Sequence, residues 1–398
     1  MSVIQPVELK TLKDFYSLMA ASRVVRCKAV AALLNGGTVS DDDVVSLTNV
    51  LSSLEDVPEA DGRKVLSLDR DRSIGLDMDY EINETRKDLF YLEEGEDTFL
   101  DLLSDLYPDF EGQVQAGRDL LQGVDFNCFI TDRDGTINNY CARYLTSIQS
   151  IYNSLFLTRF ARNKARQPVI LTSAPLDGLI DISVNPEGEM YYAASKGREC
   201  LDLEGRIRRL PISEEKQAAI NALNEQLVKL TGRPEYEKFT LIGSGLQFKF
   251  GQSTVARQDI GKSIPQAESE AFAKMLESLV AALDPDERNF RIEDTGLDVE
   301  IILTVETSGD GLKDFDKGDG VKFLNGELNL GMSHGPHLVC GDTGSDVPML
   351  EAALELAPDT RAVYVTKNED LKKRVLGLTD AALIVPEPDI LVTILGTL

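Results

Sequence analysis

The stretch that most constrains the fold lies between Phe126 and Tyr140 and reads FNCFITDRDGTINNY. A short run of aromatic and β-branched residues ends there in two carboxylates, Asp132 and Asp134, followed by Gly135. Such a run is typical of a buried strand that turns sharply at its end. Two acids crowded at a strand end repel each other, and they need a cation or a proton between them. Mg²⁺ is the usual ion for an all-oxygen site near a phosphate.

Two later segments repeat this pattern of a buried strand that ends in polar side chains. A strand is predicted over 169–173, after a helix over 144–164, and another strand is predicted over 337–340. The polar residues at these two strand ends are Thr172, Ser173, Asp342 and Asp346. Because strand, helix and strand form a right-handed parallel unit, the strand ends should meet at one edge of a sheet, where open α/β sheets bind ligands. The sequence therefore predicts a Rossmann-like α/β core.

The rest of the core and the segments around it are read from periodicity and turn signals. After residue 340 we expect strands over 362–366 and 382–385, and helices over 347–355, 369–376 and 389–395. In the N-terminal part we expect helices over 8–35, from Ser40 onward, over 97–106 and over 111–121, with a segment of alternating character over 65–80. Between these parts we expect short strands over 190–194, 240–242, 246–250, 291–293 and 299–304, with helices over 214–230 and 267–283.

These patterns divide the chain into three predicted parts. The parts are a mostly helical N-terminal extension (1–122), an α/β core (123–176 and 306–398) and an inserted α+β cap (177–305). The sequence leaves open whether the extension packs on the core or has a regulatory or dimerisation role. The acid pairs Asp69/Asp71 and Asp77/Asp79 in the extension lack a following Gly-Thr, and we interpret them as solvated loop acids, with a functional role for the first pair as the alternative.

The charge and the residue types exclude several classes of function. The formal net charge is −26, which argues against binding to nucleic acid or to an anionic membrane. An anionic substrate would need local Lys and Arg side chains. The five cysteines have neither metal-site nor disulfide-framework spacing, and two histidines are too few for a multi-His metal site. Without a long apolar run, we expect a cytoplasmic protein with reduced thiols.

A strand-borne Asp-x-Asp-Gly-Thr, a strand-borne Thr, a Lys-Gly and a strand-borne Gly-Asp-x-x-x-Asp occur here in this order. This constellation resembles the haloacid dehalogenase-like (HAD) phosphatase superfamily, whose cap corresponds in position to the insert. The resemblance implies that Asp132 is the nucleophile that becomes an aspartyl phosphate and that Asp134 is the general acid/base. It further implies that Thr172, with Ser173 as the alternative, binds the phosphoryl group, and that Lys317, with Lys322 as a rival, neutralises charge. The residues that the resemblance implies for Mg²⁺ binding are Asp132, Asp134 through its backbone carbonyl, Asp342 and Asp346. For Asp346, capping of a helix is the alternative.

Two features bear on the substrate that the resemblance implies. The cap, the Lys317–Val321 run and the chain length resemble the sugar-phosphatase branch, which includes trehalose-phosphate and sucrose-phosphate phosphatases. That branch often has Gly-Arg where this chain has Ser173-Ala174, and it lacks the acidic extension. As a whole, the chain is similar to bacterial salt-tolerance phosphatases, which hydrolyse glucosylglycerol 3-phosphate to the compatible solute glucosylglycerol in salt stress. We expect that reaction, with trehalose 6-phosphate or sucrose 6-phosphate as alternative substrates.

Basic, amide and carboxylate groups in the cap suit recognition of phosphate and sugar hydroxyls. The candidate substrate contacts are Lys249, Gln247, Arg257, Lys196, Arg198 and Glu300. Two other functions remain open on the same residues. One is a phosphomutase, which returns the phosphoryl group to the product. The other is a regulatory subunit that binds a sugar phosphate beside its cognate glycosyl-phosphate synthase, which is also the expected partner of an active phosphatase.

Overall fold

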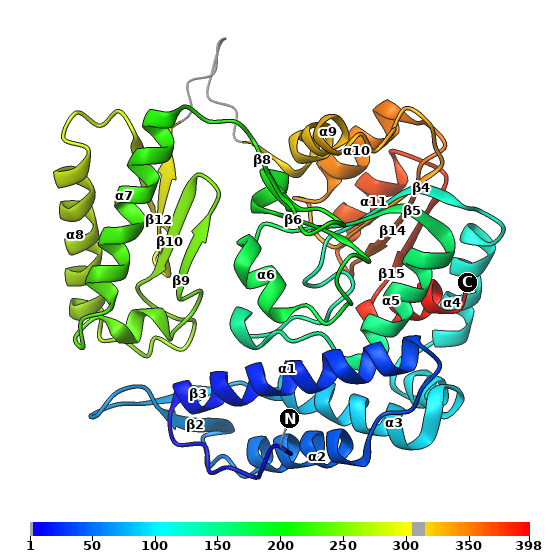
Figure 1. The fold of residues 1–398 in the computed structure, drawn as a ribbon, viewed down its shortest axis with the longest axis horizontal. Helices are drawn as coiled ribbons and strands as arrows, with labels where there is room; N and C mark the ends of the chain where they lie inside the picture. Colours follow the sequence, from blue (N-terminus) through cyan, green and yellow to red (C-terminus); the bar gives the residue numbers. More distant parts are fainter. Residues whose placement is uncertain (1–2, 305–314) are drawn as a thin grey trace.

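The computed structural model describes residues 3–304 and 315–398, and it contains three sheets, each with its own helices (Figure 1). The largest sheet has eight strands and forms the core. Its strands, in spatial order, are β15 (Ala382–Val385), β14 (Arg361–Val365), β13 (His337–Gly341), β4 (Phe126–Thr131), β5 (Ala165–Leu171), β6 (Tyr191–Ala194), β7 (Glu199–Leu201) and β8 (Ile207–Arg209). Neighbouring strands are parallel from β15 to β6, and β7 and β8 extend the edge in antiparallel pairing.

Both faces of the core sheet are covered by helices, which is the usual arrangement for parallel strands. Successive side chains of β4 point to opposite faces, so Cys128 and Ile130 pack in one apolar cluster while Phe129 packs in the other. On the second face, the ring of Phe129 meets that of Phe160 edge-on at 5.0 Å. The helices on the first face are α9 (Lys317–Leu328), α10 (Val347–Leu356) and α11 (Glu369–Leu376). Those on the second are α4 (Phe110–Leu121), α5 (Ile151–Lys164) and α12 (Pro388–Gly396), with α6 (Leu176–Ile182) nearby.

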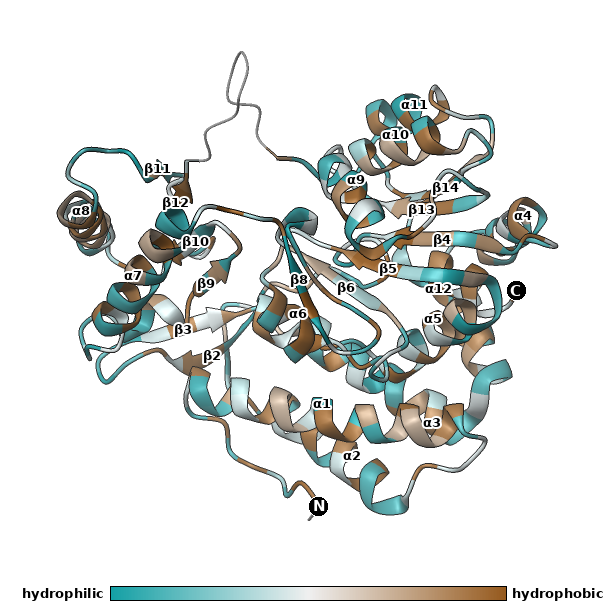
Figure 2. Ribbon diagram, turned by 45° about the horizontal axis from the view of Figure 1, so that its top comes forward, coloured by the Kyte–Doolittle hydropathy of each residue, from teal (hydrophilic) through white to brown (hydrophobic). Residues whose placement is uncertain are grey.

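The inserted cap is a four-stranded antiparallel sheet backed by two helices. Its strands, in spatial order, are β11 (Phe290–Asp294), β12 (Asp298–Leu303), β10 (Gln252–Ala256) and β9 (Leu246–Lys249). The helices are α7 (Glu214–Thr231) and α8 (Gln266–Leu283), which lie on the outer side of the sheet, so that its other face is turned toward the core (Figure 1). Brown, apolar segments line the contacts between these layers, and teal faces point outward (Figure 2).

The N-terminal extension lies along one side of both the core and the cap (Figure 1). It consists of α1 (Leu12–Leu34), α2 (Asp41–Glu55), the small sheet β1 (Glu59–Ala60), β2 (Arg63–Ser67) and β3 (Ser73–Leu76), and α3 (Asp79–Leu106). Thr11 and Asp14 form a capping box at the start of α1, and Ser40 caps α2 as the sequence predicts. The pair Arg72–Glu268, at 2.6 Å, joins the β2–β3 hairpin to α8. The extension therefore packs on the other two parts, and its regulatory or dimerisation role stays a prediction.

The expected α/β core with a parallel sheet, an α+β insert and a helical extension is confirmed, but several element predictions are wrong. The strand predicted over 190–194 belongs to the core sheet, because β6 pairs in parallel with β5. The predicted cap boundary at residue 177 is therefore too early, and the predicted return to the core at residue 306 lies outside the described residues. The predicted strand over 240–242 is instead the end of a 3₁₀ turn, η3 (Glu237–Thr240), because so short an apolar run does not distinguish strand from helix.

Two helices begin at residues other than those predicted. The helix expected from residue 144 begins at Ile151, after a single 3₁₀ turn, η1 (Tyr144–Thr146). The helix expected from residue 97 begins at Asp79 and is kinked at Gly95. Its first half buries polar side chains, which apolar periodicity does not detect. Among residues 3–304 and 315–398, no helix has both the length and the apolar character that crossing a membrane requires.

Candidate active site

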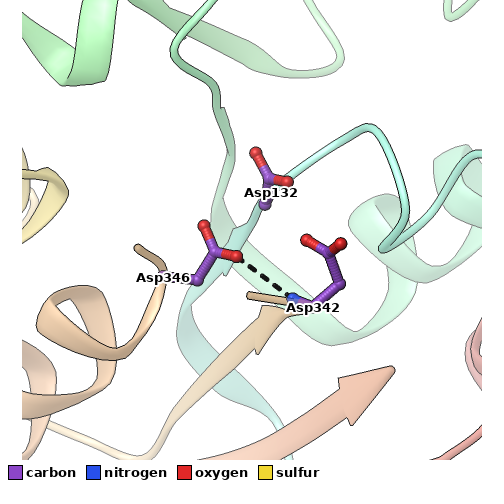
Figure 3. Close-up of side chains that lie close together, drawn as sticks. All are labelled: Asp132, Asp342 and Asp346. Carbon is purple, nitrogen blue, oxygen red and sulfur yellow. Dashed lines mark hydrogen bonds between the residues drawn. The ribbon is translucent and has the colours of Figure 1, made fainter. Parts of the chain in front are cut away.

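Three carboxylates meet at the carboxyl edge of the central strands (Figure 3), and the ammonium group of Lys317 contacts two of them. Asp132 follows β4, Asp342 and Asp346 lie in the loop after β13, and Lys317 is the first residue of α9. The Nζ atom of Lys317 lies 2.6 Å from Oδ1 of Asp132 and 2.5 Å from Oδ1 of Asp346. The three acids each offer a carboxylate oxygen, and these atoms lie within 4.8 Å of one another. The structure thus brings together four of the predicted site residues.

Local backbone interactions explain why these side chains converge. The N–H of Asp132 donates to the carbonyl of Cys340 at 3.0 Å, which holds the ends of β4 and β13 together. Oδ2 of Asp346 accepts the backbone N–H groups of Asp342 and Thr343 at 3.1 and 2.9 Å, and this fixes the loop after β13 (Figure 3). A capping box between Asp316 and Asp319 starts α9 and sets the position of Lys317.

Gly135 allows the sharp turn that follows the first two acids. Its φ angle is +85°, in the left-handed region that favours glycine. A Cβ atom at this position would also collide with the carboxylate of Asp342 and with the ring of Tyr140. The glycine is therefore required both by the backbone conformation and by the close approach of the loop after β13.

The acids carry more negative charge than one lysine can balance. Burial raises the pKa of Asp132 to about 6, against the opposing effect of Lys317 and with a further contribution from Asp346. Burial, together with the charges of Asp132 and Asp346, raises the pKa of Asp342 to about 8 although Tyr140 donates to it. Burial also disfavours ionisation of Asp346, but Lys317 outweighs it and the pKa of Asp346 is lowered. A divalent cation among these oxygens would remove the repulsion, so the donor set fits a hard metal ion.

Asp134 lies beside this cluster with its own set of partners. Its Oδ1 atom accepts a hydrogen bond from Ser147 Oγ at 3.1 Å and is ion-paired with the guanidinium of Arg133. About 29% of its side chain is exposed, whereas that of Arg133 is buried. Asp134 therefore combines access to solvent with a fixed carboxylate, which suits a group that transfers protons.

The structure also shows where the predicted Thr172 lies, and where two rival candidates, Lys322 and Asp69, lie. Thr172 directly follows β5, is buried, and accepts the N–H of Ala174 at 3.2 Å; it lies at the same sheet edge as the acids, because Thr131 pairs with Ile170. Lys322 is half exposed and pairs with Glu355 at 2.6 Å, so it is not the lysine at the acids. Asp69 pairs with Arg72 in the hairpin, as expected of a loop acid.

Three of the candidate substrate contacts share one face of the cap sheet. Gln247 and Glu300 both lie opposite Thr254 in the register of β9, β10 and β12, and Lys249 follows Gln247 by two residues on the same face. This face lies opposite α7 and α8 and is turned toward the core (Figure 1). Burial lowers the pKa of Lys249, and the positive charge of Lys196, on the core side, lowers it further. The carboxylate of Glu300 partly opposes this effect.

The two arginines among the candidate substrate contacts do not belong to this face. Arg257 is buried and donates to Asp294 at 2.7 Å and to Ser269 Oγ at 2.8 Å, both within the cap. These contacts explain Arg257 as a structural residue, and its predicted contact with substrate is not supported. The guanidinium of Arg198 lies 4.8 Å from the ring centre of Phe315, at the start of the return to the core.

Sequence reasoning missed several residues that touch the site acids. The hydroxyl of Thr136 donates to Oδ1 of Asp342 at 3.2 Å, and that of Tyr140 donates to Oδ2 of the same residue. Arg133 and Ser147 hold Asp134. Thr136 and Tyr140 lie within the stretch after β4, so their closeness in sequence to the acids was a usable signal. Nothing in the pattern indicated Ser147.

Two family models of trehalose-6-phosphate phosphatase match this chain. The family model described as "Trehalose-6-phosphate phosphatase, C-terminal" matches residues 129–391. The model described as "Trehalose-6-phosphate phosphatase N-terminal helical bundle domain" matches residues 11–107. Together the two models span the extension, the core and the cap.

Individual relatives carry related names. The alpha,alpha-trehalose-phosphate synthase (UDP-forming) 2 of Aphelenchoides avenae is 34% identical over 95% of this chain and 30% of its own length. The trehalose-phosphatase of Brugia malayi is 28% identical over 98% of this chain and 86% of its own length. A solved structure of the Candida albicans trehalose-6-phosphate phosphatase C-terminal domain, 15% identical, covers 71% of this chain and 95% of its own with a TM-score of 0.44. The chain spans about a third of the length of the synthase relatives.

Proposed function

This chain belongs to the trehalose-6-phosphate phosphatase family, and from that premise we propose that it hydrolyses trehalose 6-phosphate to trehalose and phosphate. The observation that carries the proposal is the contact of Lys317 with both Asp132 and Asp346, beside Asp342. A carboxylate nucleophile next to a lysine and further acids suits phosphoryl transfer, which asks a protein mainly for in-line positioning and cancellation of charge.

The proposed reaction has two steps. In the first, an oxygen of Asp132 attacks phosphorus, the bond between phosphorus and the sugar oxygen breaks, and Asp134 gives that oxygen a proton. In the second, Asp134 takes a proton from the water that attacks phosphorus, and cleavage of the aspartyl phosphate restores Asp132 and releases phosphate. Throughout, the ammonium group of Lys317 balances the charge on Asp132, and the hydroxyl of Thr172 binds the phosphoryl oxygens.

Mg²⁺ is the proposed cofactor, and the residues that would hold it are Asp132, Asp342, Asp346 and the backbone carbonyl of Asp134. When bound, the ion withdraws negative charge from the phosphoryl oxygens. Burial, with a smaller contribution from the neighbouring carboxylates, raises the pKa of Asp132 and of Asp342 in the absence of a cation. Binding of the ion and deprotonation of these acids are therefore coupled.

This coupling predicts that Mg²⁺ binds more tightly as the pH rises from 6 to 8.5. Below a pKa of about 8, Asp342 must lose a proton before it binds the ion, so affinity should increase by up to about tenfold per pH unit. Calorimetric titration in two buffers of different protonation enthalpy measures the released protons. Asp342→Asn should bind more weakly and with less pH dependence above pH 7. A dissociation constant that is constant between pH 6.5 and 8 would contradict the prediction.

The sugar is proposed to bind the helix-free face of the cap sheet. Gln247, Lys249 and Glu300 lie there with one amide, one ammonium and one carboxylate group, which suit paired sugar hydroxyls. Lys196 approaches from the core side, where the N–H of Phe250 donates to Ser195 Oγ at 2.9 Å and links the two parts. A substrate between the two parts would thus place its phosphate at the core acids and its hydroxyls against the cap.

Trehalose 6-phosphate replaces glucosylglycerol 3-phosphate as the proposed substrate, because both matched family models carry the former. A phosphate-release screen over trehalose 6-phosphate, glucosylglycerol 3-phosphate, sucrose 6-phosphate and mannosylglycerate phosphate, with and without Mg²⁺, tests the choice. We expect the highest kcat/KM for trehalose 6-phosphate. A higher value for another sugar would reject the substrate, and isomer formation without phosphate release would identify a phosphomutase.

A trehalose-phosphate synthase is the proposed partner of this chain. The proposed location of both proteins is the cytoplasm. The support is that the chain aligns with about a third of several relatives that are named synthases. Direct transfer of the sugar phosphate would follow if the two activities act side by side. A pull-down with this chain as bait tests the partner. Recovery of the synthase would support the proposal, and its absence from the bound fraction would contradict it.

A further inference from the structure

A line of buried hydrogen bonds connects the N-terminal extension to Asp134. The hydroxyl of Tyr80, on α3, lies 2.9 Å from Oδ1 of Asn138. Nδ2 of Asn138 donates to Ser147 Oγ at 3.0 Å, and Ser147 Oγ donates to Oδ1 of Asp134 at 3.1 Å. Tyr80, Asn138 and Ser147 are 8%, 1% and 2% exposed, so water does not compete with these bonds.

The direction of the last bond is fixed by the other partners of Ser147. A serine hydroxyl has one proton to donate and two lone pairs that accept. Its lone pairs are used by Asn138 Nδ2 and by Nη1 of Arg133, each at 3.0 Å. The single proton of Ser147 is therefore left for the carboxylate of Asp134, and a change at Asn138 would alter both the position and the direction of this bond.

The first turns of α3 also hold the rest of the loop that contains these residues. The Tyr80 hydroxyl lies 2.8 Å from the carbonyl of Ile148, Glu81 accepts from the hydroxyl of Thr146, and Glu84 accepts from Asn139 Nδ2 at 3.1 Å. This loop, residues 138–148, runs from the end of the catalytic turn to the start of α5. The extension therefore contacts the segment that carries the partners of Asp134.

We propose that Tyr80 is a positioning residue for the reaction, and that it orients the carboxylate of Asp134 through Asn138 and Ser147. The proposal rests on the proposed function, in which Asp134 protonates the leaving oxygen. It assigns to the N-terminal helical part a share in general acid catalysis, which the site residues of the core and cap do not indicate.

Orientation of a general acid matters only when the leaving group needs a proton. Sugar alkoxide and phenolate are poor leaving groups, whereas p-nitrophenolate departs without protonation. A positioned acid contributes about 10² to 10⁴-fold, so partial misalignment should cost a part of that range for poor leaving groups. The parameter kcat/KM reports the step in which the leaving group departs, because aspartyl-phosphate formation comes first.

The test compares wild-type protein with Tyr80→Phe on trehalose 6-phosphate, phenyl phosphate and p-nitrophenyl phosphate. We expect kcat/KM to fall about tenfold for the first two substrates and less than about twofold for the third, as partial loss of general acid catalysis requires. Turnover of p-nitrophenyl phosphate also shows that the variant has a folded site. Equal loss on all three substrates, or no loss, would overturn the proposal.

Two further variants separate positioning from a merely structural role. Tyr91→Phe removes a phenolic hydroxyl from the same helix, where it donates to Glu96 at 2.8 Å, and it should leave the substrate ratio unchanged. Ser147→Ala should reproduce the change in ratio, and combining it with Tyr80→Phe should add little, because both act through one chain of bonds. Additive losses would show that the two residues act separately and would overturn the proposal.

These measurements distinguish failure of the proposal from failure of the proposed function. If wild-type protein hydrolyses both aryl phosphates but not trehalose 6-phosphate, the assigned sugar is wrong, and the aryl pair still measures the effect of Tyr80. If trehalose 6-phosphate is hydrolysed and the aryl ratio does not change in Tyr80→Phe, the sugar stands and the positioning role is rejected.

Discussion

Replacing Asp132 by Asn should abolish phosphate release, with kcat falling by about 10⁴-fold or more, as when the nucleophile of a covalent mechanism is removed. The amide has nearly the same shape as the carboxylate but no negative charge with which to attack phosphorus. Because burial and Asp346 already oppose ionisation of Asp132, a neutral group there should not unfold the protein. Lys317 keeps its contact with Asp346 at 2.5 Å. Phosphate release and thermal melting, measured on the same sample, check both statements.

The matched control for this variant is Asp69→Asn. Asp69 also belongs to an Asp-x-Asp pair, but it lies in the β2–β3 hairpin and pairs with Arg72. We expect turnover close to wild type from this control. Retention of more than a tenth of wild-type activity in Asp132→Asn, with the melting temperature unchanged, would reject Asp132 as the nucleophile.

The central strands and the convergence of the acids could be predicted because both follow from simple patterns. A strand buried on both faces is an uninterrupted apolar run, and the buried segments 128–130 of β4, 169–171 of β5 and 338–340 of β13 have this character. Parallel strands connected by helices end at one sheet edge, so Asp132, Asp342 and Asp346 had to approach one another once the strands were identified. Lys317 needed the resemblance as well, since spacing alone does not bring a helix N-terminus to that edge.

The features that the sequence did not predict are of two kinds. In some, polar side chains are buried; in others, a strand pairs with a partner that the local sequence does not specify. The first half of α3 buries Glu81, Glu84 and Lys87 among its apolar residues, so polar side chains interrupt the apolar period of its inner face. The sequence pattern places the strand at 190–194 in the cap, because the residues of a short strand do not indicate which sheet it joins; in the structure, β6 pairs with β5 of the core. Ser147 interrupts the helix expected from residue 144 because its hydroxyl and carbonyl bind Arg133.

A buried ionic network connects α3 to the C-terminal helix α12. Nζ of Lys87 lies 2.6 Å from Oδ2 of Asp389 and 2.9 Å from Oε1 of Glu84, and all three side chains are at most 10% exposed. Burial disfavours the charged form of Lys87, but Asp389 and Glu84 outweigh it and raise its pKa well above the usual value. Asn139 donates to both acids, at 3.1 and 3.2 Å, so the network also reaches the loop after the catalytic turn.

Lys87→Met should therefore lower the free energy of unfolding by about 3–5 kcal/mol, because it leaves two buried carboxylates without their cation. The neighbouring Arg86→Met removes an ion pair of similar length, 2.6 Å to Glu55, from the exposed side of the same helix. That control should cost less than about 1 kcal/mol, since water solvates both exposed partners. Urea unfolding of the two variants measures the difference directly. A loss in Lys87→Met no larger than that in Arg86→Met would mean that Glu84 and Asp389 take up protons or water at little cost, and that the network does not hold the extension to the core.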